Sequence, residues 1–287
     1  VDKSWNEFVS TWKSPWIRMI QNYVKTTGPE WREFFRKANI EKLKIIGEAI
    51  VKAMPDDDDF FPHNGTPLIL AAMSGNVEIV AELLETESKK KQPEDHNGRT
   101  PLHYAASNGH LRAFQMIVEK FGEWKLKDID GYTPLHEAAC NGHFEVCKFI
   151  VEMTKNYCPN GFILNELNEH GVTPFQGAAE EGELEVCKLL IDNAANKNPE
   201  TKNGRTLLHD LVREKDCLDA CRLIIERIED KLPLDSSEDT PLHLAGEAGN
   251  IEMCQMIVNS LSVINPVIDA HGSTLLHSLA SYNLIEP

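Results

Sequence analysis

Residues 133–153 read TPLHEAACNGHFEVCKFIVEM, and this stretch decides the fold. Thr133 is a favoured helix N-cap residue, and Pro134 follows at the first helical position, where its missing N–H costs no hydrogen bond. The pair Asn141-Gly142 suits the left-handed dihedrals that end a helix. Apolar residues at helical spacing resume from Phe144. The stretch therefore predicts a short helix, a turn and a second helix.

The same pattern recurs along the chain at a nearly fixed interval. Related stretches begin at Thr66, Thr100, Thr133, Thr173, Thr206, Thr240 and Thr274. The steps between these threonines are 34, 33, 40, 33, 34 and 34 residues. Such a period marks one supersecondary unit that buries its apolar face by stacking on its neighbours. With a tight-turn signal at Asp130-Gly131 before the motif, the sequence predicts an all-α solenoid of helix–turn–helix–hairpin units.

The repeated Thr-Pro-Leu-His-x-Ala resembles the ankyrin repeat, and the resemblance covers residues 60–287. It implies stacked helix pairs with hairpin fingers that project at right angles. Partners of this family dock on the fingertips and on the first helix of each pair. The resemblance also implies that the motif histidines tie adjacent fingers through hydrogen bonds. These histidines are His103, His136, His209, His243 and His277.

Two units depart from the motif. The fourth has Phe175-Gln176-Gly177 where Leu-His-x is usual, and seven extra residues precede it near 154–162. We expect the finger or helix end there to protrude. The fifth unit, from Thr206, lacks both the proline and the Asn-Gly turn. We expect that unit to be locally less regular.

The chain before the first full motif is predicted to form a cap. Residues 29–59 are interpreted as a degenerate capping repeat with an acidic linker, and residues 1–28 as an N-terminal helical segment with an aromatic stripe. The favoured interpretation packs the stripe against the capping repeat; a partner-binding helix or a membrane-surface anchor is the alternative. The net charge of residues 1–27 is only +2, so we expect no stable membrane contact.

Charge and cysteine content limit the classes of function. The net charge is −16, yet residues 1–54 carry ten Lys and Arg against six Asp and Glu, which leaves −20 for the rest. Direct nucleic-acid binding by the repeats is therefore not expected, whereas a protein partner with a basic face would be attracted. Seven cysteines without a C-x-x-C pair favour reduced thiols in the cytosol or nucleus. The start of the chain lacks the pattern of a secretory signal.

No pattern for catalysis or cofactor binding stands out. The chain has no G-x-S-x-G or H-E-x-x-H motif and no glycine-rich phosphate loop. Cys217 and Cys221 are four residues apart, but two thiols do not complete a tetrahedral metal site. His136, Cys140 and His143 lie close in sequence, yet His136 already has a place in the motif. We therefore expect no enzyme activity, no cofactor and no metal.

Positions before each motif threonine form the fingertips implied by the resemblance, and those seven and eight residues after it line the groove. Arg99, Tyr104, Ile129 and Tyr132 are predicted as the centre of the binding surface, since aromatic residues and Arg dominate binding energy. Glu180 and Glu181 are its predicted acidic flank. The full set of predicted partner-binding residues is Arg99, Tyr104, Ser107, Asn108, Ile129, Asp130, Tyr132, Asn141, His170, Val172, Glu180, Glu181, Arg205 and Arg213.

Asn165 and Asn198 each lie eight residues before a motif threonine. The resemblance implies that an Asn at this position can be a substrate of a 2-oxoglutarate-dependent hydroxylase. A role in stabilising the finger is the alternative interpretation, and it is the favoured one.

The leading hypothesis is a non-catalytic protein-binding module that is monomeric when alone. A second hypothesis makes the repeats the regulatory arm of a larger channel, enzyme or toxin, since the chain begins at Val1 and ends at Pro287. A third places a small-molecule or metal-dependent activity in residues 1–54. Stabilisation by metals or nucleotides in a thermal-shift screen would favour the third.

We predict that the Thr206 unit is the first to open, because its first helix lacks the proline and the Asn-Gly turn. Each repeat touches only its neighbours, so stability varies along the chain. Hydrogen exchange should show less protection in this unit than in the Thr100 and Thr133 units. Equal protection in all three would contradict the prediction.

Overall fold

The computed structural model describes residues 67–86, 91–157, 162–201 and 203–261. The predicted segment 1–28, the capping repeat and linker 29–59 and the last repeat from Thr274 lie outside these residues. The chain divides into two compact units, Val1–Ala138 and Ala139–Pro287. In the described ranges the chain is helix and loop, with an isolated antiparallel bridge between Glu200 and Thr206.

The first unit is built from pairs of short helices. Its described helices are α5 (Pro67–Ser74), α6 (Val77–Thr86), α7 (Pro101–Ser107), α8 (Leu111–Phe121) and the start of α9 (Pro134–Cys140). First helices pack on first helices, α5 on α7, and second helices on second helices, α6 on α8. Phe114 and Ile117 of α8 are at most 1% exposed, so these two side chains are fully buried by the packing.

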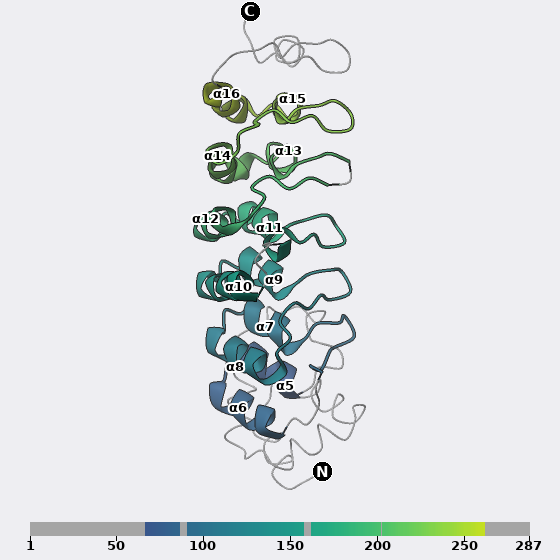
Figure 1. Cartoon of the computed structure of the whole chain (residues 1–287), viewed down its shortest axis with the longest axis vertical. Helices are drawn as coiled ribbons and strands as arrows, with labels where there is room; N and C mark the ends of the chain where they lie inside the picture. Colours follow the sequence, from purple (N-terminus) through teal and green to yellow (C-terminus); the bar gives the residue numbers. More distant parts are fainter. Residues whose placement is uncertain (1–66, 87–90, 158–161, 202, 262–287) are drawn as a thin grey trace, which may run out of the picture. The chain divides into compact units, whose positions relative to one another are not determined.

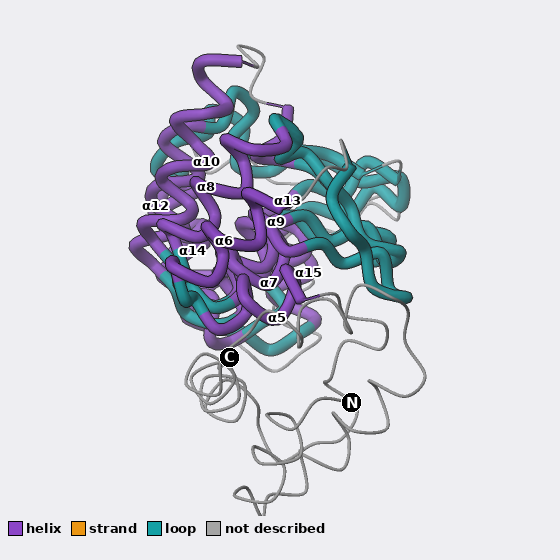
Figure 2. The backbone as a smooth tube through the Cα atoms, turned by 90° about the horizontal axis from the view of Figure 1, so that it is seen from below, coloured by secondary structure: helices purple, strands orange, loops and turns teal. Residues whose placement is uncertain are grey.

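The second unit continues the same scheme. After the end of α9 come α10 (Phe144–Tyr157), η2 (Phe162–Asn165), α11 (Pro174–Glu180), α12 (Leu184–Asn193), α13 (Leu207–Leu211), η3 (Lys215–Cys217), α14 (Leu218–Ile225), α15 (Pro241–Glu247) and α16 (Ile251–Ser260). The second helices α10, α12, α14 and α16 contact one another in sequence order (Figure 1). Figure 2 shows that α13 and α15 lie nearer the finger loops than α12 and α14.

The motif Thr and His form the start of the first helices α7, α9, α13 and α15. The Thr100 N–H donates to His103 Nδ1 at 3.1 Å, which satisfies a backbone group that helix geometry leaves open. The other ring nitrogen, His103 Nε2, lies 3.1 Å from the Tyr132 carbonyl oxygen of the next finger. His209 Nε2 makes the same contact with the Asp239 carbonyl at 3.1 Å. The expected finger-tying role is confirmed for His103 and His209. It is not seen for His243, because His243 Nε2 has no hydrogen-bond partner among the described residues. His277 lies outside the described residues.

Gln176 explains why the fourth unit tolerates the loss of histidine. The Thr173 N–H donates to Gln176 Oε1 at 2.9 Å, and the Gln176 N–H donates to Thr173 Oγ1 at 3.1 Å. Gln176 Nε2 reaches Asp210 Oδ2 of the next unit at 3.5 Å. The Gln176 amide therefore accepts the same threonine N–H as the motif histidine does. Its contact to the next unit goes to the Asp210 side chain instead of a finger carbonyl.

An Asp or Asn five residues before the motif threonine holds most of the described fingers. Asp95 Oδ1 accepts the Asn97 and Arg99 N–H groups at 2.9 and 2.8 Å. Asp128, Asn168 and Asp235 repeat this pair of bonds in their own fingers. Backbone bonds also join neighbouring fingers within a unit, from Ile129 N to Asn97 O in the first and from Ser236 N to Asn203 O in the second. The fingers are thus fixed by hydrogen bonds at their base and side.

The insertion near 154–162 and the Thr206 unit both depart from the regular repeat, as the sequence predicts. Helix α10 has 14 residues, against 10 in α12 and α16, and its last residue Tyr157 is 67% exposed, so the insertion lengthens and exposes this helix end. Helix α13 of the Thr206 unit has only five residues and is followed by the short 3-10 helix η3.

Gly177 is required by a close approach within the second unit. A Cβ atom at this position would lie 2.3 Å from Cys140 Sγ, closer than real Cβ atoms come to other atoms. The unusual glycine of the fourth motif therefore makes room for the thiol of the preceding repeat. Among the described residues no helix has the length and apolar character that a bilayer span needs.

Gly177→Ala should lower the free energy of unfolding by about 1 kcal/mol, because the Cys140 side chain must leave its rotamer. In a Cys140→Ala background the same change should raise stability by about 0.5–1 kcal/mol, since Ala is the better helix former. Urea unfolding of the four proteins of this double-mutant cycle measures both effects. The same sign in both backgrounds would contradict the steric explanation.

His103 should make the fold sensitive to acid. Burial lowers the pKa of His103 to about 4, while its bond to the Tyr132 carbonyl acts in the opposite direction. The unfolded value is near 6.5, so the unfolded chain binds more protons between these values. The free energy of unfolding should therefore fall as the pH drops below about 6.5, by on the order of 1–2 kcal/mol at pH 5, and level off near pH 4.

His103→Gln should keep the cap, as Gln176 does naturally, and should flatten this part of the pH dependence. His103→Ala should lower stability at every pH, because it leaves the Thr100 N–H without its acceptor. Urea unfolding at pH 7 and pH 5 separates the two outcomes. An unchanged slope in the Gln variant would show that His103 is not the titrating group.

Candidate functional site

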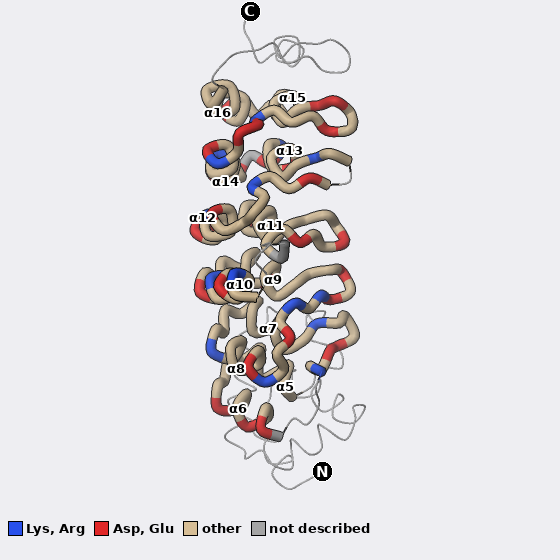
Figure 3. Tube along the Cα trace, in the orientation of Figure 1, with Lys and Arg blue, Asp and Glu red and all other residues tan. Residues whose placement is uncertain are grey.

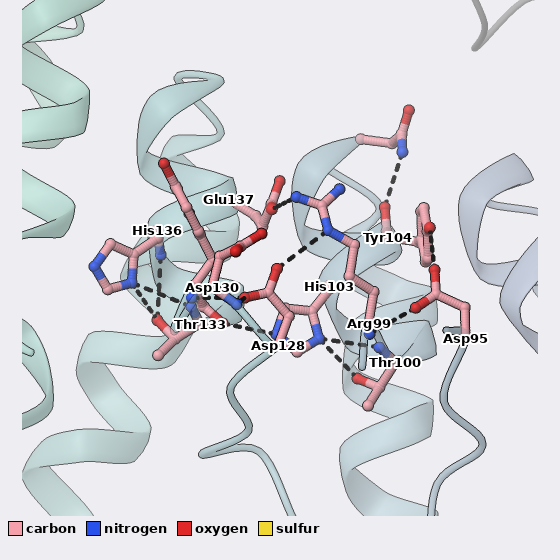
Figure 4. Close-up of polar contacts among 12 residues, drawn as sticks. Asp95, Arg99, Thr100, His103, Tyr104, Asp128, Asp130, Thr133, His136 and Glu137 are labelled. Atoms are coloured by element: carbon pink, nitrogen blue, oxygen red, sulfur yellow. Dashed lines mark hydrogen bonds and ion pairs between the residues drawn. The ribbon is translucent and has the colours of Figure 1, made fainter. Parts of the chain in front are cut away.

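Arg99 joins two fingers of the first unit. Its N–H is held by Asp95 at the base of its own finger, so the side chain leaves from a fixed point. The guanidinium then reaches the next repeat, where Nε lies 3.3 Å from Asp128 Oδ2 and Nη2 contacts Glu137 Oε1. Figure 4 shows the guanidinium between the two carboxylates. Arg99 is half-buried, so much of its charge is used inside the protein.

The carboxylates around Arg99 are buried more deeply than the arginine itself. Asp128 and Glu137 are 7% and 8% exposed. Burial raises the pKa of Glu137, and the Arg99 charge opposes that rise. Burial lowers the pKa of Arg99, but Glu137, Tyr104 and Asp128 more than offset this, so its net pKa is raised. Removing one partner of such a pair leaves a buried charge, and the cluster is therefore structural in the first instance.

Tyr104 is buried, so the expectation that its side chain lies on the exposed surface is wrong. Its side chain is 5% exposed, and its hydroxyl donates to Asp95 Oδ2 at 2.8 Å (Figure 4). Burial, then the bond to Asp95, raises the pKa of Tyr104 far above its ordinary value. The physical reason is that the aspartate of the finger base needs a second donor, and the tyrosine on the first helix of the same unit supplies it.

Among the described finger residues of the first unit, Ile129 is the exposed large apolar one. Its side chain is 63% exposed, while its backbone N–H is bound to Asn97 O at 2.9 Å. Asp130 beside it is exposed. Tyr132 is half-buried, with its ring 5.7 Å from that of His136 in an edge-to-face arrangement. Ser107 and Asn108 are half-buried at the end of α7, where Asn108 Nδ2 donates to the Tyr104 carbonyl at 2.9 Å.

The predicted residues of the second unit are mostly exposed. Asn141, His170, Glu180, Glu181 and Arg213 are exposed, whereas Val172 and Arg205 are half-buried. Arg205 Nε lies 3.3 Å from Asp210, and Arg213 Nη2 lies 3.2 Å from Glu247 of the next repeat. Both arginines are therefore paired within the chain.

Glu180 lies among other carboxylates on the groove-side end of α11. Burial raises the pKa of Glu180, followed by the charges of Glu214 and Glu181. All three side chains are exposed. The negative charges of these three carboxylates repel one another, so a cationic group placed beside them would relieve that repulsion.

The two candidate hydroxylation sites both make structural bonds. Asn165 Nδ2 donates to the Asn196 carbonyl at 2.8 Å. Asn198 Oδ1 accepts the Leu208 N–H at 3.0 Å, in the first turn of α13. Each asparagine thus ties its finger to a neighbouring segment of the second unit. Their modification stays a prediction.

The acidic residues around Arg99 were missed in the sequence. A signal for Asp95 and Asp128 was present, because each lies five residues before a motif threonine and three before a turn glycine. No comparable signal marked Glu137. Among the residues that the structure describes, no group of three or more His, Cys, Asp and Glu side chains could hold a metal ion.

Known proteins share the sequence pattern and the fold. A protein from Arabidopsis thaliana, the putative E3 ubiquitin-protein ligase XBAT31, is 43% identical over 56 residues, which are 20% of this chain and only 12% of that protein. The human ASB11 ankyrin repeat domain superposes with a TM-score of 0.60 at 20% identity, over 78% of this chain and 99% of that one. The ankyrin repeat domain of Bcl-3 gives a TM-score of 0.66 at 21% identity, over 75% and 94%.

The family model of ankyrin repeats in three copies matches residues 38–128, 68–160, 117–201 and 153–233. These overlapping matches cover well over half of the chain. The chain therefore belongs to the ankyrin-repeat family.

Proposed function

We propose that this chain binds a protein partner through its fingers and the groove side of its first helices, without catalysis of its own. The repeats carry the interaction. In sequence order the chain has a helical segment at 1–28, a capping repeat with its linker at 29–59 and the repeat domain at 60–287. The chain acts as a monomer in the cytosol or nucleus. Ankyrin repeats generally serve as protein-binding modules, which supports the first part of this proposal.

The observation that carries the proposal is Ile129. A large apolar side chain is 63% exposed on a finger whose backbone is already bound to Asn97 and to the base residue Asp128. The fold does not need an isoleucine at this position, since neither bond involves its side chain. An apolar group held on a pre-ordered loop loses little entropy on binding, which makes it suited to anchor a partner.

Charge supports a partner with a basic face. Residues 139–261 contain 22 Asp and Glu against 11 Lys and Arg. Acidic residues colour the finger loops of the second unit in Figure 3. Glu169 and Glu238, four and two residues before their motif threonines, are exposed. With the Glu180, Glu181 and Glu214 carboxylates on the groove side, this unit would attract a cationic surface and speed its association.

Ile129→Ser tests the anchor, with Ile251→Ser as the matched control. Ile251 is 47% exposed at the start of α16, away from the fingers, so the chemical change is the same. The parent chain would capture a partner from native lysate, and the partner would be identified by mass spectrometry and then titrated. We expect about tenfold weaker binding for Ile129→Ser, about 1.4 kcal/mol, and unchanged binding for the control.

Equal binding by Ile129→Ser and Ile251→Ser would contradict the anchoring role of Ile129, provided that circular dichroism shows both variants to be equally folded. Tyr104 variants are unsuitable for this test, because the buried hydroxyl bond to Asp95 makes them folding variants.

Glu180→Gln/Glu181→Gln tests the attraction of a basic face. We expect a slower association rate and a weaker dependence on salt, because fewer charges then act at long range. Glu145→Gln/Glu152→Gln on α10 is the control, since both residues are exposed on a second helix. Identical salt dependence in all three proteins would exclude the acidic groove side as the source of attraction.

A second candidate is a regulatory ankyrin arm within a larger channel, enzyme or toxin. Its support is that the sequence relative above matches over only 12% of its own length, so such repeats also occur as a small part of longer proteins. The full-length reading frame decides between the two candidates.

A further inference from the structure

Three cysteines of the second unit lie near one another, and two of them contact carbonyl groups of α11. Cys187 lies on α12, Cys217 ends η3 and Cys221 lies on α14. Cys217 Sγ donates to the Ala179 carbonyl at 3.5 Å, and Cys187 Sγ donates to the Phe175 carbonyl at 4.0 Å. These two carbonyls are four residues apart, so they lie about one turn apart on the same face of α11. Thiols from two consecutive repeats therefore contact the same helix, and Cys217 is near enough for its charge to act on Cys187.

The folded protein protects these thiols. All three side chains are at most 1% exposed. Burial, followed by the neighbouring Cys217, raises the pKa of Cys187 to about 12. Burial, followed by Glu180 and Glu214, raises the pKa of Cys217 to about 11. The thiolate is the reactive form, so neither cysteine reacts at neutral pH while this junction stays closed.

The same junction contains the least regular repeat of the described chain. Helix α13 has five residues, Leu207–Leu211, and the 3-10 helix η3 replaces the usual turn before α14. Helix η3 is held mainly through its contact with α11 and α14. Short helices with few internal hydrogen bonds open at low free-energy cost. Opening here would free Cys217 before the longer helix α12, which carries Cys187.

We propose that Cys187 and Cys217 form a reversible disulfide, a redox latch that closes the junction between the Thr173 and Thr206 repeats. The oxidant is a small-molecule disulfide. The Cys217 thiolate attacks it and forms a mixed disulfide, which releases one small thiol; the Cys187 thiolate then displaces the second. Two protein thiols are oxidised, one small disulfide is reduced, and the two released thiols carry the two protons.

The latch would change the dynamics of one repeat. A bond between residues 187 and 217 closes a loop across two repeats and removes open conformations of that loop. Reduced protein would open at the Thr206 unit, whereas oxidised protein would keep it closed. This inference does not depend on the proposed partner binding, because none of the three thiols is on the finger surface.

Oxidised glutathione tests the latch on the whole chain. After incubation the free thiols are alkylated, and peptides are mapped by mass spectrometry. We expect a Cys187–Cys217 peptide pair and at least about tenfold slower hydrogen exchange in α13 and η3, both reversed by dithiothreitol. Cys217→Ala should lose both effects. Cys254→Ala is the matched control, because Cys254 is a buried cysteine on α16 outside this cluster, and it should keep both.

Three results would contradict the proposed disulfide latch. These are no linked peptide, a Cys217–Cys221 disulfide instead, or a Cys187–Cys217 disulfide with unchanged hydrogen exchange in α13 and η3. The parent chain alone decides these outcomes, so they do not depend on the folding of a variant.

Discussion

The structure depends on a histidine that makes bonds at both ring nitrogens. In the Thr100 unit, His103 Nδ1 accepts the threonine N–H and Nε2 lies against the Tyr132 carbonyl of the next finger. One side chain therefore starts a helix and joins two repeats, so local structure and stacking are set together. This explains why the first helices can be as short as five to seven residues, well below the length at which isolated helices are stable in water.

The fold could be read from the sequence because the same physical constraint is repeated. Capping threonine, N1 proline and turn glycine each act over a few residues, and their period gives the stacking. Even the irregular units were foreseen, as the extended α10 and the short α13 show. The role of Gln176 was not foreseen, since only the folded structure shows an amide oxygen in the place of an imidazole nitrogen.

The candidate site was less predictable because exposure depends on contacts between distant residues. Ile129 was expected to be exposed and is. Tyr104 was expected to be exposed too, but Asp95, nine residues earlier, holds its hydroxyl in the interior. Arg99 was chosen as a surface cation, yet two carboxylates of the following repeat take up its charge. Sequence position placed these residues on the fingers and the first helix, while their pairing could be seen only in the folded structure.

The contact between Cys140 and Gly177 shows that the repeats are not interchangeable parts. The side chain seven residues after one motif threonine occupies space that the side chain four residues after the next would need. A consensus repeat inserted in place of the Thr173 unit would bring a Cβ atom into the Cys140 sulfur. The residues at such a pair of positions must fit each other, so each repeat packs well only beside the neighbour whose side chains match it. A chain built by shuffling these units would match the motif at every position and still pack poorly at its junctions.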